Sequence, residues 1–136
     1  MDNVLVNKAA TIERCIGRIK AEYAAAGEDF DTDYTRQDSV ILNLERCAQA
    51  CIDMGTHIIR LRRLGIPQTS REIFALLETH GYLPPELDTR LQAMVGFRNI
   101  AVHDYQRLNI DIVRAIVETR LDDFTDFASL MLKQFG

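Results

Sequence analysis

Apolar residues recur at alternating steps of three and four along most of the chain, which is the period of an amphipathic helix. The first stripe runs through residues 5–23 and predicts a helix with one buried face. A second, broader stripe predicts a long helix over about residues 35–64, where Gly65 and Pro67 supply the expected stop. No segment shows the two-residue alternation of a strand. The pattern therefore predicts an all-α protein.

Three further helices are predicted after this stop. Residues 69–72 read Thr-Ser-Arg-Glu, a capping box that begins a third helix ending near His80. A fourth helix starts at Pro84, and a final one spans about residues 109–135. Because all the connections are short, we expect an antiparallel bundle of about five helices in a single domain of residues 1–136.

The stripes also define an expected core and an expected surface. Cys15, Cys47 and Cys51 fall within apolar stripes without Cys-x-x-Cys spacing, so we expect buried, reduced thiols rather than a zinc or redox site. The second stripe includes Leu61 as a core position. Three acidic residues of the final helix are predicted to lie in solvent: Asp122, Asp123 and Asp126.

Composition narrows the class of protein further. Hydrophobic residues make up 47% and charged residues 26%, values typical of a globular chain. No apolar run approaches the about 18 residues of a membrane span, and the N-terminus Met-Asp-Asn-Val is acidic and polar where a signal peptide would be basic. We therefore expect a soluble, cytoplasmic protein. A net charge of −4 argues against coating nucleic acid through an overall field. It leaves room for a local phosphate site.

The stripe of the fourth helix contains two residues that do not fit a core. It consists of Leu87, Leu91, Met94, Arg98, Ala101 and Tyr105, so a guanidinium and a phenol stand where apolar side chains are expected. An unpaired guanidinium is costly in a core but tolerated beside a groove or a partner subunit. We therefore expect Arg98 to border a cleft.

A histidine follows Arg98 by five residues. In an ideal helix this spacing rotates His103 by roughly 140° from Arg98, so one straight helix would not aim both at one atom. Either the helix ends near His103 and turns the imidazole inward, or two copies of the chain bring their motifs together across a symmetric interface. Asn99 lies one turn before His103 on the same face.

The residues from Arg98 to Tyr105 resemble the Arg-x4-His-x-Tyr motif of HEPN domains of the HepT toxin type. The second predicted helix is also similar to that family's second helix over residues 43–59, and the resemblance covers nearly the whole chain. It implies an all-α homodimer whose paired motifs line a cleft and cleave RNA without a metal or other cofactor. The ribose 2′-hydroxyl would attack the adjacent phosphorus and leave a cyclic phosphate.

Residue chemistry agrees with these implied roles. Arg98 would stabilise the charge that builds on the phosphoryl oxygens, and His103 would accept or donate the proton. Asn99 would orient His103 or bind a phosphate oxygen, and Tyr105 would stack on a base or bind the backbone. Which copy of His103 is the base is not specified.

The resemblance further implies a protein partner. In HepT-type systems a minimal nucleotidyltransferase acts as the antitoxin and adenylylates a tyrosine at the position of Tyr105. An AMP group there would place a bulky anion beside Arg98, occupy the phosphate site and repel the RNA backbone.

Several alternatives remain open at this stage. Arg98 could instead form a structural ion pair with Asp53, and the spacing of Asp53 and His57 fits two metal ligands, although no further ligand completes a metal site. Arginines 60, 62 and 63 either interact with the helix dipole or contact RNA away from the cut. The main alternative function is a non-catalytic nucleotide-binding or substrate-binding subunit of a nucleotidyltransferase complex, and a purely structural dimerisation bundle is a third.

Overall fold

The computed structural model describes residues 1–136, and its regular secondary structure consists of helices only. The six α-helices are α1 (Asn3–Ala26), α2 (Tyr34–Arg62), α3 (Ser70–Thr79), α4 (Pro85–His103), α5 (Ile110–Thr119) and α6 (Asp122–Phe135). Two short 3₁₀ turns connect them, η1 (Gly27–Asp29) and η2 (Tyr105–Arg107). The predicted all-α class is confirmed, with six helices where about five were expected.

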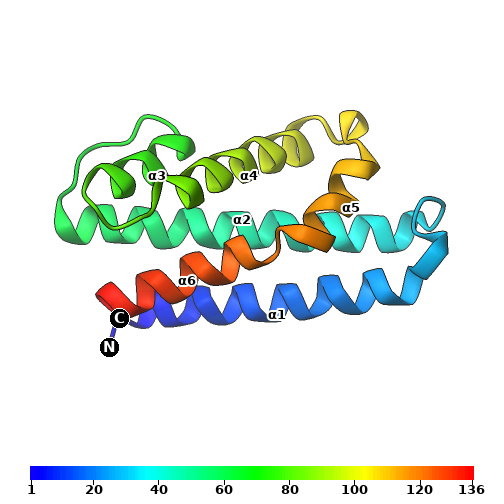
Figure 1. Ribbon diagram of the computed structural model, residues 1–136, viewed down its shortest axis with the longest axis horizontal. Helices are drawn as coiled ribbons and strands as arrows, with labels where there is room; N and C mark the ends of the chain where they lie inside the picture. Colours follow the sequence, from blue (N-terminus) through cyan, green and yellow to red (C-terminus); the bar gives the residue numbers. More distant parts are fainter.

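The two longest helices form the frame of the molecule. α1 and α2 run antiparallel along its length, and α3 and α4 lie on the side of α2 away from α1 (Figure 1). α6 returns across α1 and also contacts α2 and α4, which brings the two chain termini together at one end (Figure 1). None of the helices combines the length and the apolar composition that crossing a membrane requires.

Side-chain caps explain where the helices begin. Asp2 and Asp33 each accept a hydrogen bond from a backbone N–H in the first turn of α1 and of α2, and Thr69 does the same for α3. α2 ends at Arg62, two residues before the predicted position. Arg63 there takes the left-handed conformation at φ 53°, a helix-ending geometry that glycine usually supplies.

The predicted final helix is wrong as a single element, because it divides into α5 and α6 near Arg120. Buried residues on both sides of the break keep helical spacing, as Ile116 and Phe124 show, so the periodicity does not reveal it. Asp123, expected in solvent, is also buried and accepts a hydrogen bond from Nε of Arg90 on α4 at 2.9 Å. A charged partner on a neighbouring helix makes that burial tolerable.

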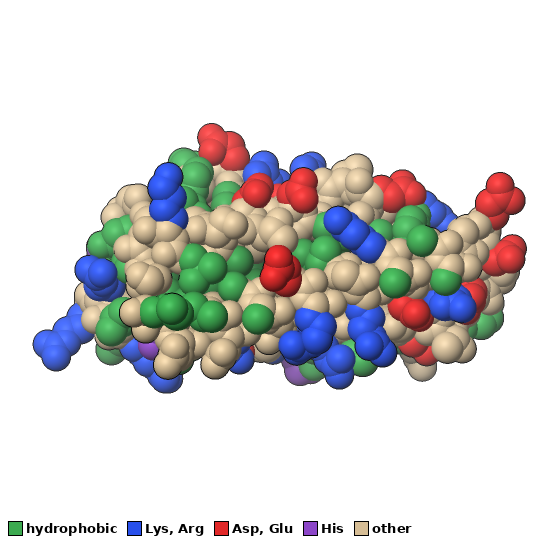
Figure 2. All heavy atoms as spheres, turned by 90° about the horizontal axis from the view of Figure 1, so that it is seen from below, with side chains coloured by type: hydrophobic (Ala, Val, Ile, Leu, Met, Phe, Trp, Pro, Cys, Tyr) green, Lys and Arg blue, Asp and Glu red, His purple; other side chains and the backbone are tan.

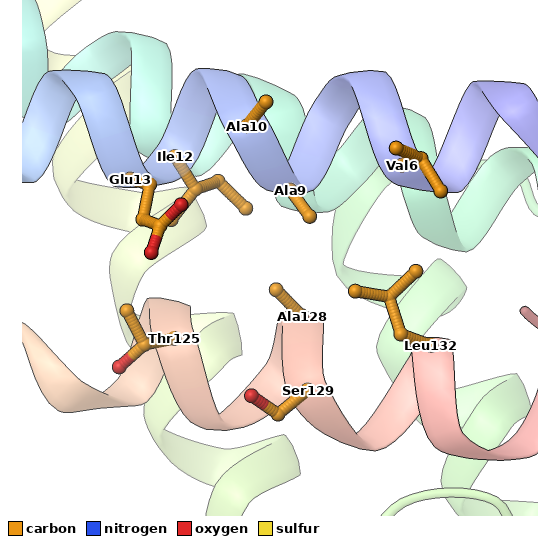
Figure 3. Close-up of a pocket in the computed structure, with 9 residues that line it drawn as sticks. All are labelled: Val6, Ala9, Ala10, Ile12, Glu13, Thr125, Ala128, Ser129 and Leu132. Carbon is orange, nitrogen blue, oxygen red and sulfur yellow. The ribbon is translucent and has the colours of Figure 1, made fainter.

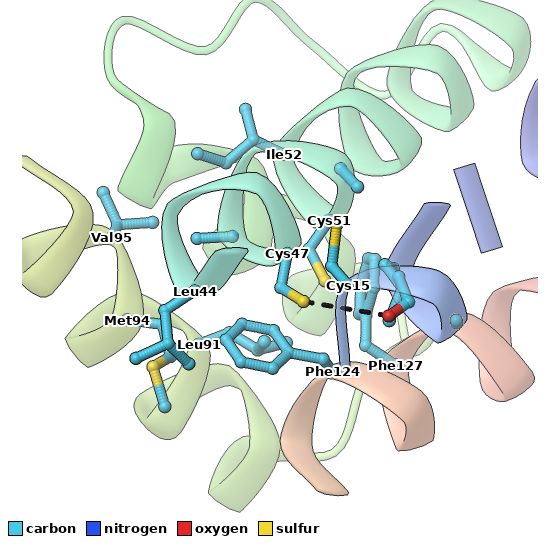
Figure 4. Close-up of a cluster of buried hydrophobic side chains, with 14 of the residues drawn as sticks. Cys15, Leu44, Cys47, Cys51, Ile52, Leu91, Met94, Val95, Phe124 and Phe127 are labelled. Atoms are coloured by element: carbon cyan, nitrogen blue, oxygen red, sulfur yellow. Dashed lines mark hydrogen bonds between the residues drawn. The ribbon is translucent and has the colours of Figure 1, made fainter. Parts of the chain in front are cut away.

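One continuous cluster of 35 buried hydrophobic residues fills the bundle. Figure 4 shows its centre, where the cysteines of α1 and α2 meet phenylalanines of α6. All three cysteines are buried and unpaired, as predicted. Burial raises the pKa of the Cys47 thiol, and the same effect holds Cys51 protonated. Leu61 departs from the prediction, since its side chain is exposed beyond the edge of the core.

Candidate functional site

Arg98 lies on α4 where this helix packs along α2, and its guanidinium is held by two amides. Nη2 donates to Oε1 of Gln49 on α2 at 2.7 Å, and Nη1 donates to Oδ1 of Asn99 at 2.9 Å. The suggested ion pair with Asp53 is wrong, because that carboxylate binds Lys8 at 3.0 Å and the amide of Gln49 at 2.8 Å. No carboxylate neutralises Arg98, so its positive charge is oriented and remains available to an anion.

His103 is the last residue of α4. The backbone leaves the helix at Asp104, whose N–H still donates to the carbonyl of Ile100. The helix therefore ends at His103, as the first of the two expectations requires. The imidazole does not turn inward, however; it is exposed and makes no hydrogen bond within the chain. Asn99, one turn earlier, contacts Arg98 rather than His103.

Tyr105 lies in η2, just after the helix on which it was predicted. Its hydroxyl donates to Oδ1 of Asp38, near the start of α2, and its side chain stays 43% exposed. Partial burial and the carboxylates of Asp38 and Glu45 raise the pKa of Tyr105 above its ordinary value. The phenol is thus protonated at neutral pH and accessible to another protein.

An open pocket of about 250 Å³ borders Arg98, as the interrupted stripe predicted. The pocket is lined by Leu42, Glu45, Arg46, Gln49, Arg98 and Val102. Leu42 and Val102 are large apolar side chains that are nearly half exposed, as is Ile100 on the same turn of α4. The pocket therefore combines two arginines, one carboxylate and an apolar rim, while His103 and Tyr105 are not among the residues that line it.

A second hollow of the surface, between α1 and α6, lacks these features. The groove between α1 and α6 has a volume of about 360 Å³, but Glu13 is the one ionisable side chain among the residues that line it (Figure 3). The same side of the molecule carries charges of both signs and an apolar area toward the end that holds the termini (Figure 2). His57, weighed as a metal ligand with Asp53, instead pairs with Asp2 at 2.7 Å, and no cluster of three ligand side chains is placed to hold a metal ion.

Two residues of the site were not identified from the sequence. Gln49 and Asp38 both lie on α2, where they contact Arg98 and Tyr105 across a sequence separation of more than forty residues. Gln49 lies within residues 43–59, the stretch that resembles the family's second helix, and Asp38 lies five residues before it. Nothing in their local pattern distinguishes them from other polar residues on an exposed helix face.

Comparison with known proteins establishes the family. A family model described as ribonuclease HepT-like matches residues 12–131. The mRNA nuclease HepT of Shewanella oneidensis is 51% identical over 131 residues, covering 96% of this chain and 98% of that protein. The tRNA nuclease HepT of Aphanizomenon flos-aquae is 24% identical over 121 residues, covering 89% of this chain and 82% of that protein.

A solved structure shows the same fold. The tri-AMPylated HEPN toxin of Shewanella oneidensis, in complex with the MNT antitoxin, superposes with a TM-score of 0.93 at 50% identity. The superposition covers 98% of this chain and 99% of that chain. The chain belongs to the HepT-like ribonuclease family, and the predicted resemblance to HEPN ribonuclease toxins of the HepT type is confirmed.

Proposed function

We propose that this protein is an endoribonuclease toxin that works as a homodimer. Two relatives are nucleases by name, one for mRNA and one for tRNA, which favours cleavage over a purely nucleotide-binding role. Leu42, Ile100 and Val102 expose apolar surface around Arg98, and a symmetric contact between two copies would cover it. Such a contact would bring two copies of Arg98 and His103 to one cleft.

In the proposed reaction the ribose 2′-oxygen attacks the adjacent phosphorus and the bond from phosphorus to the 5′-oxygen breaks. His103 of one protomer accepts the 2′-hydroxyl proton, and His103 of the partner subunit donates a proton to the departing 5′-oxygen. Arg98 holds the phosphoryl oxygens as their negative charge grows. The products are a 2′,3′-cyclic phosphate and a 5′-hydroxyl, and no step requires a metal.

The observation that carries this proposal is the amide cradle of Arg98. Gln49 and Asn99 fix the guanidinium by hydrogen bonds at 2.7 and 2.9 Å without cancelling its charge. A structural ion pair would use a carboxylate at this position. The cradle is what preorganised stabilisation of a phosphoryl oxyanion requires, because the donor is oriented before the charge develops.

We expect the purified protein to cleave RNA in excess EDTA. The measurement is product analysis of an oligonucleotide. The 3′ ends of the fragments should resist end-labelling until the cyclic phosphate is opened and the resulting phosphate is removed, and their 5′ ends should accept phosphate directly. Cleavage that stops in EDTA and returns with added Mg²⁺, or fragments with 5′-phosphates, would contradict the proposed chemistry.

Replacing Gln49 by Glu should separate the effect of orienting the Arg98 guanidinium from the effect of its positive charge. The carboxylate of Gln49→Glu retains the contact with Arg98 but neutralises it, so we expect kcat/KM for RNA to fall about 10- to 100-fold, the range of one charge-assisted hydrogen bond. The melting temperature should fall only slightly, because Gln49→Glu also loses the hydrogen bond that the Gln49 amide donates to Asp53 and places two carboxylates one turn apart. Gln49→Leu removes the contact but leaves the charge of Arg98 unneutralised. This variant is the matched comparison and should lose less activity than Gln49→Glu. Equal activity of Gln49→Glu and the unmodified protein would show that the cradle has no such role.

The same site explains how a partner would silence the protein. We propose that a cognate minimal nucleotidyltransferase is the antitoxin and that it transfers AMP to the Tyr105 hydroxyl. The AMPylated state of the Shewanella oneidensis toxin in its antitoxin complex supports this. In this chain Tyr105 is partly exposed in η2, two residues after His103 ends α4. A phosphodiester attached there would compete with RNA for Arg98.

A further inference from the structure

The pocket beside Arg98 leads into a larger trough along α2. Gln49 lines both, and the trough has a volume of about 660 Å³. One wall is the side of α2 down to Arg60, and the other is the connection to α3 together with Ser70 and Ile73 of that helix. Along α2 the rise from Gln49 to Arg60 is about 16 Å. The trough therefore extends well beyond the space that one phosphodiester occupies.

The trough is lined by both polar and apolar side chains and presents one cation without a carboxylate partner. Its lining includes the hydroxyls or amides of Thr56, Gln68, Thr69 and Ser70. Asp53 is the one acidic side chain among the lining residues, and Lys8 neutralises it at 3.0 Å. Arg60, in contrast, is exposed and has no carboxylate partner within 4.0 Å. A surface of this kind suits a chain of phosphates and sugar hydroxyls.

The three arginines that end α2 have different environments. Arg62 packs over the ring of Phe135 with its guanidinium carbon 5.0 Å from the ring centre, which gives it a structural role. Arg63 forms the left-handed residue that ends the helix and lines neither the trough nor the pocket of Arg98. Arg60 alone of the three lines the trough. If the three arginines interacted only with the helix dipole, there would be no reason for Arg60 alone to line the trough.

On the other side of Arg98 the charge is mixed, because Glu45 and Arg46 both line its pocket. Asp38 and Glu45 face Tyr105 from the first half of α2, and their carboxylates raise the pKa of that tyrosine. Unpaired carboxylates therefore lie toward Tyr105, whereas the one carboxylate of the trough is paired with Lys8. This difference favours the direction toward Arg60 for an RNA strand that is bound at Arg98.

We propose that the trough from Gln49 to Arg60 binds the single-stranded RNA segment that flanks the cleaved bond, with Arg60 holding a backbone phosphate. This inference rests on the proposed ribonuclease function. Arg60 takes no part in the chemical step; it positions RNA that is long enough to reach it.

The test measures binding of a 12-nucleotide RNA by fluorescence anisotropy over a range of salt concentrations. The protein carries His103→Ala so that the RNA is not cut. We expect Arg60→Gln to weaken binding about fivefold and to reduce the slope of log K against log salt by about 0.7, the loss of one single-strand phosphate contact. Arg63→Gln, which removes the same charge one helical turn away, should leave the slope unchanged.

Three outcomes would overturn the inference. Arg60→Gln could leave RNA binding unchanged, or both variants could weaken binding equally, which would indicate only the general field of the helix end. Alternatively, Arg60→Gln could impair assembly with the nucleotidyltransferase while RNA binding is retained, which would make the trough a protein-docking surface. Failure of the proposed function is distinguishable from all three, because the unmodified protein would then not cleave RNA.

Discussion

Arg98→Ala and His103→Ala should each reduce RNA cleavage in EDTA to background. Losing the guanidinium removes the main stabilisation of the phosphoryl charge, for which a single donor is typically worth about 10²–10³ in rate. Losing the imidazole removes proton transfer, which typically contributes about 10²–10⁴. Since Arg98 is half-buried at the α2–α4 contact and His103 is exposed, neither change should unfold the bundle. Initial cleavage rates of a labelled RNA measure the effect.

Matched controls come from residues of the same types elsewhere. His80 is exposed at the end of α3, where its ring contacts the carbonyl of Leu76, and Arg120 is exposed at the break between α5 and α6. His80→Ala and Arg120→Ala should cleave RNA at nearly the unmodified rate. Circular dichroism and the oligomeric state should be the same for all four variants. Cleavage that persists in both Arg98→Ala and His103→Ala would point to a contaminating nuclease and against this site.

Tyr105 should be the acceptor when the protein is incubated with ATP, Mg²⁺ and its cognate nucleotidyltransferase. We expect the intact mass to rise in steps of one adenylyl group and RNA cleavage to fall in parallel. The raised pKa of Tyr105 keeps the phenol protonated, so its proton must be removed during transfer, and Asp38 already accepts a hydrogen bond from it. Mass spectrometry and the cleavage assay on the same samples link the two effects.

Tyr105→Phe should prevent the mass increase and make RNA cleavage insensitive to the nucleotidyltransferase and ATP. Tyr34 offers a control, because its side chain is 70% exposed at the start of α2 and stands outside the site. Tyr34→Phe should be modified and silenced like the unmodified protein. Mass addition that continues in Tyr105→Phe, or an adenylylated protein that still cleaves RNA, would remove this switch.

Arg98 illustrates what could be predicted from the sequence. A helical stripe assigns each residue to a face, so a guanidinium on the buried face indicates an edge of the core beside an opening, and an open pocket does border it. The positions of His103 and Tyr105, five and seven residues after Arg98, then led to the family resemblance. These inferences need only the period of one helix and the residue types upon it.

Gln49 illustrates what could not be predicted from the sequence. Its contact with Arg98 depends on how far α2 slides past α4 and on how each helix is rotated, and neither quantity is encoded in the period of a single stripe. The same holds for the pairing of Asp123 with Arg90 and for the break at Arg120, across which helical spacing continues. Tertiary packing decides these features, while local patterns decide where helices form.

The most direct measurement is a crystal structure of the protein with a short RNA whose 2′-hydroxyls are methylated to prevent cleavage. We expect a symmetric dimer in which Arg98 contacts the oxygens of one phosphate and both copies of His103 lie within hydrogen-bond reach of the methylated 2′-oxygen or the 5′-oxygen. Two motifs on opposite faces of the assembly, or RNA bound away from Arg98, would contradict the proposed cleavage site.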